Sequence, residues 1–149
     1  MKLLTSFLSL VTAIAAYAGI EGVVIHDGVR YTKDGDAAQY KGSDYKNAIR
    51  VERHITLERA FEIANSDPEI GYFVFLKGGQ MVLEIPPGTP FDPKDDPLGL
   101  AVHTPFIYDS GDHSVGYCRI FRHGDTVFFK NEGRWLGSAP GYADTYIKE

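Results

Sequence analysis

The residue types best suited to chemistry gather near the middle of the chain. Two histidines and two aspartates, His103, Asp109, Asp112 and His113, lie within 11 residues. Imidazole nitrogens and carboxylate oxygens ligate zinc, and carboxylates with backbone carbonyls ligate calcium. The spacing matches no closed metal motif, so the favoured interpretation is a turn whose aspartates accept backbone N–H groups. We expect no cofactor, with a bound divalent metal, zinc or calcium, as the alternative.

The same segment also carries the residue types of a hydrolytic site. Ser110 or Ser114 could attack a substrate, and His123 joins the two histidines as a candidate base, with the two aspartates to orient it. Such a site needs hydrogen bonds between these groups and donors for an oxyanion. Adjacency in the sequence does not establish that geometry, so the segment predicts candidate catalytic residues without fixing a mechanism.

A second group of residues is suited to recognition. Arg134, Trp135 and Tyr142 flank a predicted loop over Gly137 to Gly141. Aromatic faces can stack on a sugar or grip an apolar peptide, and the guanidinium offers fixed donors. These three residues are therefore the predicted ligand-binding residues. The competing interpretation places Trp135 inside as the anchor of a terminal hairpin, because large aromatic side chains are usually well buried.

Several short strands and one helix must position these residues. Asp27-Gly28 predicts a hairpin turn within residues 22–32, and residues 33–46, with Asp34 and Asp36, predict a solvated loop. A short strand is predicted over residues 47–54. Thr56 is a predicted N-cap, and apolar residues at helical spacing continue to Ala64, before Asp67-Pro68 ends the helix.

The apolar run Tyr72–Leu76 predicts the central strand of the core, because it is apolar on both faces. With residues 81–85 it predicts a hairpin. The proline-rich residues 86–105 predict no regular ladder. Further strands are expected at residues 114–121, 126–130, 134–136 and 142–147. This pattern predicts a mainly β fold with one short helix, at the α+β boundary, forming a small antiparallel barrel or sandwich.

The N-terminus has the order of a secretory signal. Lys2 is followed by an apolar stretch to Ala16, and Ala16-Tyr17-Ala18 fits a signal peptidase site. The stretch is shorter than the ~20 residues of a membrane-spanning helix. We therefore expect a signal peptide at 1–18, a single β-rich domain at 19–149, and a secreted or periplasmic location. An uncleaved anchor or a buried N-terminal helix is the alternative.

Composition narrows the possible partners. The formal net charge is −5, and loss of Lys2 with the signal makes it −6. An acidic chain without a basic cluster is poorly suited to phosphate backbones or anionic lipid, so we expect no nucleic-acid partner and no membrane contact after cleavage. The single cysteine, Cys118, cannot form an internal disulfide, and its place in an apolar run predicts a buried thiol.

These observations leave three functional hypotheses. The preferred one is a secreted binding module that recognises a carbohydrate or protein ligand through loop aromatics. The second is a small secreted hydrolase or metal-dependent enzyme centred on the segment from His103 to His113. The third, an exported toxin or effector, makes no distinctive prediction from the residues. Whether the domain is an enzyme is open, and the absence of P-loop, GxGxxG, HExxH, GxSxG and paired CxxC motifs argues mildly against the common classes.

Overall fold

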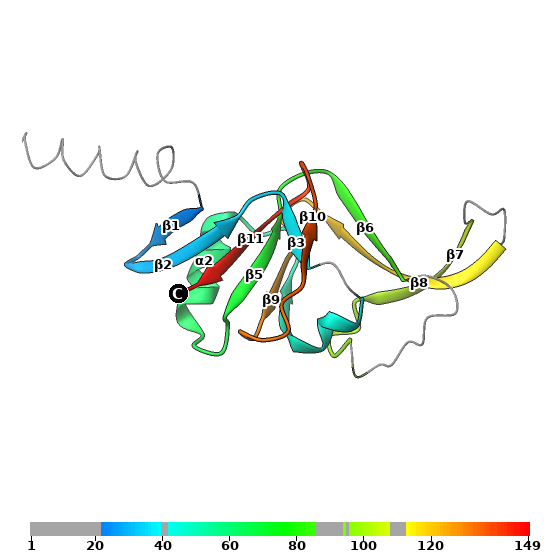
Figure 1. Ribbon diagram of the computed structural model, residues 1–149, viewed down its shortest axis with the longest axis horizontal. Coiled ribbons are helices and arrows are strands. Elements are labelled where there is room, and N and C mark those ends of the chain that lie inside the picture. The colour runs from blue at the N-terminus through cyan, green and yellow to red at the C-terminus, as the bar shows by residue number, and fades with distance from the viewer. Residues whose placement is uncertain (1–21, 40–41, 86–93, 95, 108–112) are drawn as a thin grey trace, which may run out of the picture.

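Antiparallel strands dominate the computed structural model of this chain (Figure 1). It describes residues 22–39, 42–85, 94, 96–107 and 113–149, with backbone alone at 42–44, 82–85, 102–107 and 113–118. The predicted signal at residues 1–18 lies outside these ranges. No helix in the described ranges has the length and apolar character needed to cross a bilayer.

A six-stranded antiparallel sheet forms the body of the domain, with the strand order β1-β2-β11-β5-β9-β4. The strands are β1 (Val23–His26), β2 (Val29–Asp34), β11 (Ala143–Lys148), β5 (Tyr72–Leu76), β9 (Thr126–Phe129) and β4 (Ala48–Glu52). All five residues of β5 are buried, between β11 and β9, because the strand is apolar on both faces. The predicted central strand is therefore confirmed. The predicted first hairpin is also present, with Asp27 and Gly28 at positive φ in the β1–β2 turn.

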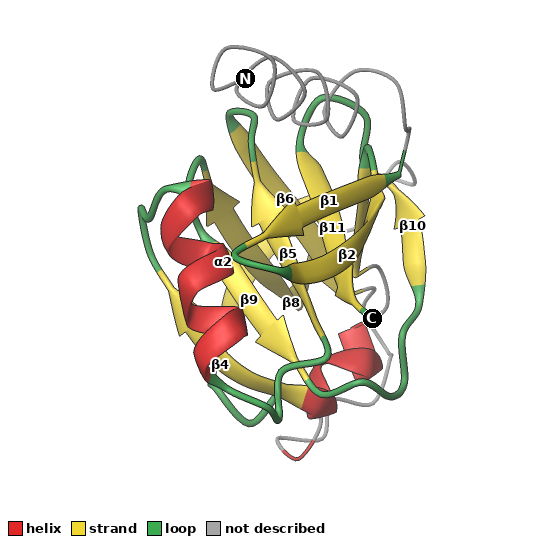
Figure 2. Ribbon diagram, turned by 90° about the vertical axis from the view of Figure 1, so that its left-hand side faces the viewer, coloured by secondary structure: helices red, strands yellow, loops and turns green. Residues whose placement is uncertain are grey.

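The helix α2 (Leu57–Ser66) covers one face of this sheet (Figure 2). Thr56 caps it as predicted, since its Oγ1 accepts a hydrogen bond of 3.1 Å from the Arg59 N–H. The helix ends before Asp67-Pro68, also as predicted. Its buried side chains pack on aromatic residues of the sheet, and the buried members of this cluster are Tyr31, Ala60, Phe61, Ile63, Ala64, Ile70, Phe73, Phe75, Phe128 and Tyr146.

Smaller elements cover the opposite face. They are a three-stranded sheet of β6 (Gln80–Ile85), β8 (His113–Arg122) and β7 (Ala101–Ile107), a pair of β3 (Ala37–Gln39) with β10 (Leu136–Ser138), and the 3-10 helix η2 (Gly42–Asn47). The outer parts of β7 and β8 extend away from the main sheet (Figure 1). The second core includes Tyr45, Tyr72, Val74, Leu76, Met81, Leu100, Phe121, Val127 and Phe129. The mainly β, sandwich-like fold is as predicted, although the described strands form no closed barrel.

The predicted hairpin of β5 and β6 is wrong. β5 uses both edges for β11 and β9, and β6 pairs with β8 in a different sheet. The intervening turn changes direction at Lys77 and Gly78, whose N–H groups donate to the Tyr142 carbonyl. Local turn residues thus predicted the reversal of the chain, while the sheet partners come from distant segments.

Three other segments differ from the sequence prediction. Pro105 lies within β7, which is tolerated because, among the described strands, β7 pairs only with β8 and proline can occupy an edge strand. Residues 33–46, predicted as a loop, contain β3 and η2. The strand predicted at residues 134–136 is instead β10 at Leu136–Ser138, so Arg134 and Trp135 precede it.

Candidate ligand-binding surface

The backbone separates the two histidines of the predicted catalytic or metal cluster. His103 lies opposite Tyr117 in the β7–β8 ladder, and His113 lies opposite Ile107. The two register positions are four residues apart, or about 13 Å along a strand. Asp109 and Asp112 lie outside the described residues, so the metal and hydrolytic interpretations stay predictions. Among side chains that the structure describes, no three of His, Cys, Asp and Glu gather at metal-binding distance.

The side chain of His26 is only 11 % exposed. Nε2 lies 2.8 Å from Glu58 Oε1, and Nδ1 lies 3.0 Å from the amide nitrogen of Asn65. Because Asn65 Oδ1 accepts from the Tyr31 hydroxyl, its amide nitrogen must donate to His26. Nδ1 is therefore the acceptor and Nε2 carries the proton, so both ring nitrogens serve the packing of α2 on the β1–β2 hairpin.

Trp135 lies at the surface, with 54 % of the residue exposed. The interpretation of Trp135 as the buried anchor of a hairpin is therefore wrong. Tyr72 of β5 is fully buried and stacks on Phe129, with 4.7 Å between the ring centroids. The Trp135 N–H donates to Oε1 of buried Gln39 at 3.3 Å, and Gln39 Oε1 also accepts from the Tyr72 hydroxyl. The indole thus projects from a backbone that is tied to the core.

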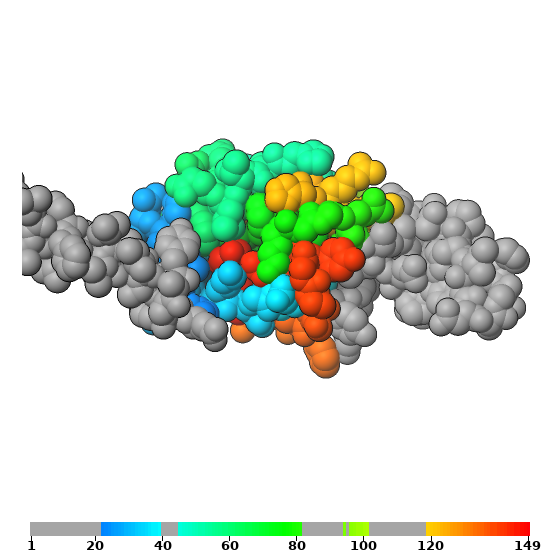
Figure 3. All heavy atoms as spheres, turned by 90° about the horizontal axis from the view of Figure 1, so that it is seen from above, coloured from blue at the N-terminus to red at the C-terminus, as the bar shows by residue number. Residues whose placement is uncertain are grey.

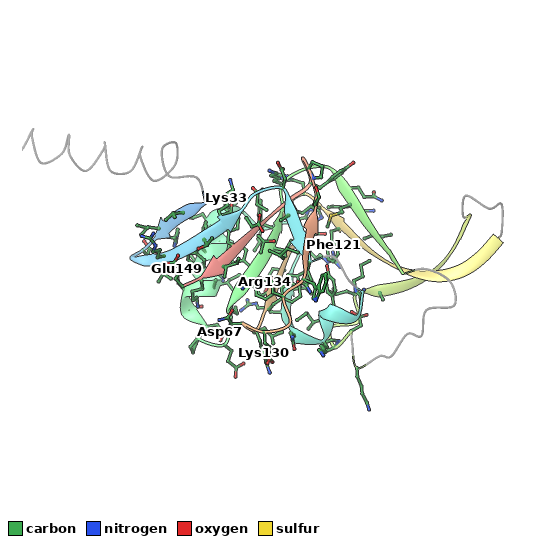
Figure 4. All side chains as sticks on the ribbon, in the orientation of Figure 1. Lys33, Asp67, Phe121, Lys130, Arg134 and Glu149 are labelled. Atoms are coloured by element: carbon green, nitrogen blue, oxygen red, sulfur yellow. The ribbon has the colours of Figure 1, made fainter. Side chains whose placement is uncertain are left out.

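Arg134 lies beside Trp135, exposed in part but turned back over the sheet (Figure 4). Its guanidinium carbon lies 5.8 Å from the centre of the Tyr72 ring, at the outer limit of a cation–π contact. This contact occupies one face of the guanidinium and leaves its edge donors as the groups that could reach a ligand. Arg134 and Trp135, which are consecutive in the sequence, therefore lie on the same part of the surface.

Tyr142 is 43 % exposed but lies at the other end of β10. Its carbonyl accepts from Lys77 and Gly78, which places it beside the β5–β6 turn. The β2–β3, β5–β6 and β10–β11 turns meet at this end of the domain, as the cyan, green and orange surfaces in Figure 3 show. The three predicted ligand-binding residues therefore form two separate aromatic positions, because three-residue β10, about 10 Å long, divides them.

An ion-pair network holds these turns together. Lys77 Nζ lies 2.8 Å from Asp36 Oδ1 and 2.8 Å from Oδ1 of buried Asp144. The hydrogen bonds from Lys77 and from the Gly141 N–H lower the pKa of Asp36. The hydrogen bonds to Asp144 and Asp36 raise the pKa of Lys77. Asp36 lies in an exposed turn as predicted, but the sequence did not show that its partners lie 41 and 105 residues away.

A second pair that sequence reasoning missed lies inside the other core. Arg119 is 1 % exposed, its guanidinium carbon stacks 4.2 Å from the Tyr45 ring centre, and its Nη2 lies 3.5 Å from Asp96 Oδ1. Its three nitrogens and Asp96 Oδ1 have no hydrogen-bond partner in the structure as described. A cavity of about 10 Å³, room for one water molecule, lies nearby between Tyr45 and Phe121. This pair is a buried charged contact within the second core.

No protein-family model, curated protein or solved structure matches the chain. The functional interpretation therefore depends on the chemistry of its own surface. In the described part of that surface, four large apolar or aromatic residues are exposed: Ile25, Ile120, Trp135 and Tyr142. Two of the four flank β10, which makes the β10 side of the domain the candidate ligand-binding surface.

Proposed function

We propose that this domain is a binding module that recognises a protein or carbohydrate ligand through the surface around Trp135. The main supporting observation is the half-exposed indole on a backbone tied to buried Gln39. A backbone that is already held in place lowers the conformational cost of binding a partner. Covering roughly 100 Å² of its apolar surface would contribute about 2.5 kcal/mol at about 25 cal/mol/Å².

Arg134 and Tyr142 extend this proposed surface. Arg134 adds fixed hydrogen-bond donors next to the indole, and Tyr142 adds a second exposed ring beyond β10. Together with the signal expected at residues 1–18, the proposal describes a module that acts outside the cytoplasm, secreted or in the periplasm. In the residues described, no observation favours the hydrolytic, metal-dependent or toxin alternatives over this one.

Arrays of glycans and peptides, probed with wild type and with Trp135→Ala, test the proposal. Ile25→Ala is the matched control, because Ile25 on β1 is also 54 % exposed. We expect wild type and the control to bind the same ligands and Trp135→Ala to lose them. Exposed substitutions change stability by only about 0.5 kcal/mol, so all three proteins should melt together. A wild type that binds nothing on either array, or a Trp135→Ala variant that binds normally, would remove the proposal.

A further inference from the structure

β10 has an open edge in the described part of the structure. Its three residues pair with β3 alone, in the register Leu136↔Gln39, Gly137↔Ala38 and Ser138↔Ala37. Figure 2 shows β10 at the outside of the domain, with no labelled strand beyond it. The outer edge of this strand therefore faces away from the sheet.

The hydrogen bonds around β3 reveal where the main-chain groups of β10 point. The Ala37 carbonyl accepts from Thr145 Oγ1 at 3.0 Å, and the Gln39 carbonyl accepts from the Tyr45 hydroxyl at 3.3 Å. Both carbonyls thus point away from β10. Hydrogen-bonded and non-hydrogen-bonded pairs alternate in an antiparallel ladder, so the hydrogen-bonded pair is the central one, Gly137↔Ala38.

It follows that Leu136 and Ser138 direct their N–H and C=O groups toward the open edge. These four groups have no hydrogen-bond partner among the described residues. Such a row is a template for another strand. The edge strand β4 differs, because a bulge at Ala48/Arg50 disturbs its register and it carries the charged side chains of Arg50 and Glu52.

We propose that the ligand is an extended peptide segment of a partner protein, which adds to the open edge of β10 as a further strand. This inference rests on the proposed function and names its ligand class. Main-chain groups of Leu136 and Ser138 would hold the peptide, and Trp135 and Tyr142 would contact its side chains at the two ends. The spacing of these features fits a core of three to five extended residues, about 10–17 Å long.

The size of the edge favours a peptide over a second copy of the domain. Two outward-facing residues can form at most four main-chain hydrogen bonds, and rigid domains paired over three residues bury far less than the ~1,200–2,000 Å² of a stable interface. A peptide can follow the edge and still reach both rings. A sugar could stack on Trp135, but it lacks the alternating donors and acceptors of a strand.

Selection from a displayed library of random linear 12-residue peptides tests the proposal. The selected peptides would be synthesised and titrated against wild type, Ser138→Pro and Ser138→Ala. Proline removes one outward N–H, which is tolerated at a strand edge, whereas alanine removes only the hydroxyl. We expect Ser138→Pro to weaken binding about tenfold, the equivalent of one hydrogen bond, and Ser138→Ala to bind as wild type does.

N-methylation of single peptide amides gives a second test that does not depend on folding of a variant. We expect affinity to fall at alternate positions only, because alternate residues of a strand face the edge. Strand addition would be overturned if the selected peptides lose affinity for Trp135→Ala but keep it for Ser138→Pro and after N-methylation at every position. That result would leave the proposed function standing. Failure to select any peptide, or a dimer of the wild type that Ser138→Pro abolishes, would also overturn strand addition.

Discussion

The two faces of the main sheet are covered in different ways. On one face α2, contiguous in the sequence, packs on Phe73, Phe75 and their aromatic neighbours. On the other face, Tyr72, Val74 and Leu76 are covered by η2, β3, β10 and the β6–β8–β7 sheet, which come from distant parts of the chain. The helix face is an apolar core, whereas the second face contains the buried Arg119–Asp96 pair and carries β10 at its margin.

The two coverings are expected to contribute different amounts of free energy to folding. Apolar burial contributes stability without requiring partners, so the helix face can anchor the fold. Buried charges cost desolvation that their attraction offsets only in part, so we expect the Arg119–Asp96 pair to contribute little net stability to the second face. The proposed binding surface adjoins this second face.

The largest effect should come from the helix face. The Phe73 ring is fully buried and lies 5.1–6.0 Å from the rings of four other residues, which are Tyr31, Phe61, Phe128 and Tyr146. Phe73→Ala should lower the free energy of unfolding by about 3–5 kcal/mol, because the cavity cannot collapse inside a packed aromatic cluster. Urea denaturation followed by circular dichroism measures this. An unchanged midpoint would show that the helix face does not anchor the fold.

On the second face, Asp96→Ala should destabilise the domain by about 3 kcal/mol. The substitution leaves the Arg119 guanidinium buried without its counter-charge. The double variant Asp96→Ala/Arg119→Met should recover most of the loss, because it removes both buried charges. If the single and double variants have the same urea midpoint, the pair does not behave as a coupled buried ion pair.

Alkaline pH should weaken both faces through buried tyrosines. Burial raises the pKa of Tyr31, on the helix face, to about 12, and burial raises the pKa of Tyr45 on the other face. A raised pKa favours the protonated form in the folded state. The stability that Tyr31 contributes is therefore intact below its unfolded pKa of about 10 and is lost as pH rises toward 12.

For one titrating proton, the free energy of unfolding changes by at most about 1.4 kcal/mol per pH unit. Urea midpoints measured from pH 9 to pH 12 should fall, and Tyr31→Phe should fall less steeply than wild type. If the urea midpoint falls equally steeply with pH in wild type and Tyr31→Phe, ionisation of Tyr31 does not cause the loss of stability.

The smallest effect should come from the helix cap. Thr56→Ala removes the acceptor for the Arg59 N–H and should cost about 1 kcal/mol. Thr56→Ser keeps the hydroxyl and is the matched control. Thermal melts of the two variants should separate, with the serine variant close to wild type. Coincident melts would mean that water replaces the cap without loss.

Local patterns in the sequence determined the elements that depend on near neighbours. Asp27-Gly28 specified the first turn because both positions accept positive φ, and the spacing of Leu57, Ala60, Phe61 and Ala64 specified α2. The apolar run of β5 specified a central strand because its side chains require burial on both faces of the sheet. The mainly β fold class followed from such local signals.

Only the tertiary structure decided which strands pair and which aromatic residues are exposed. β5 and β6 separate into different sheets because β9 and β11 occupy both edges of β5. Trp135 is exposed because buried Gln39, 96 residues away, ties its backbone at the rim while Tyr72 fills the core. No residue type near Trp135 encodes this outcome, because pairing and exposure depend on contacts between segments that are far apart in the chain.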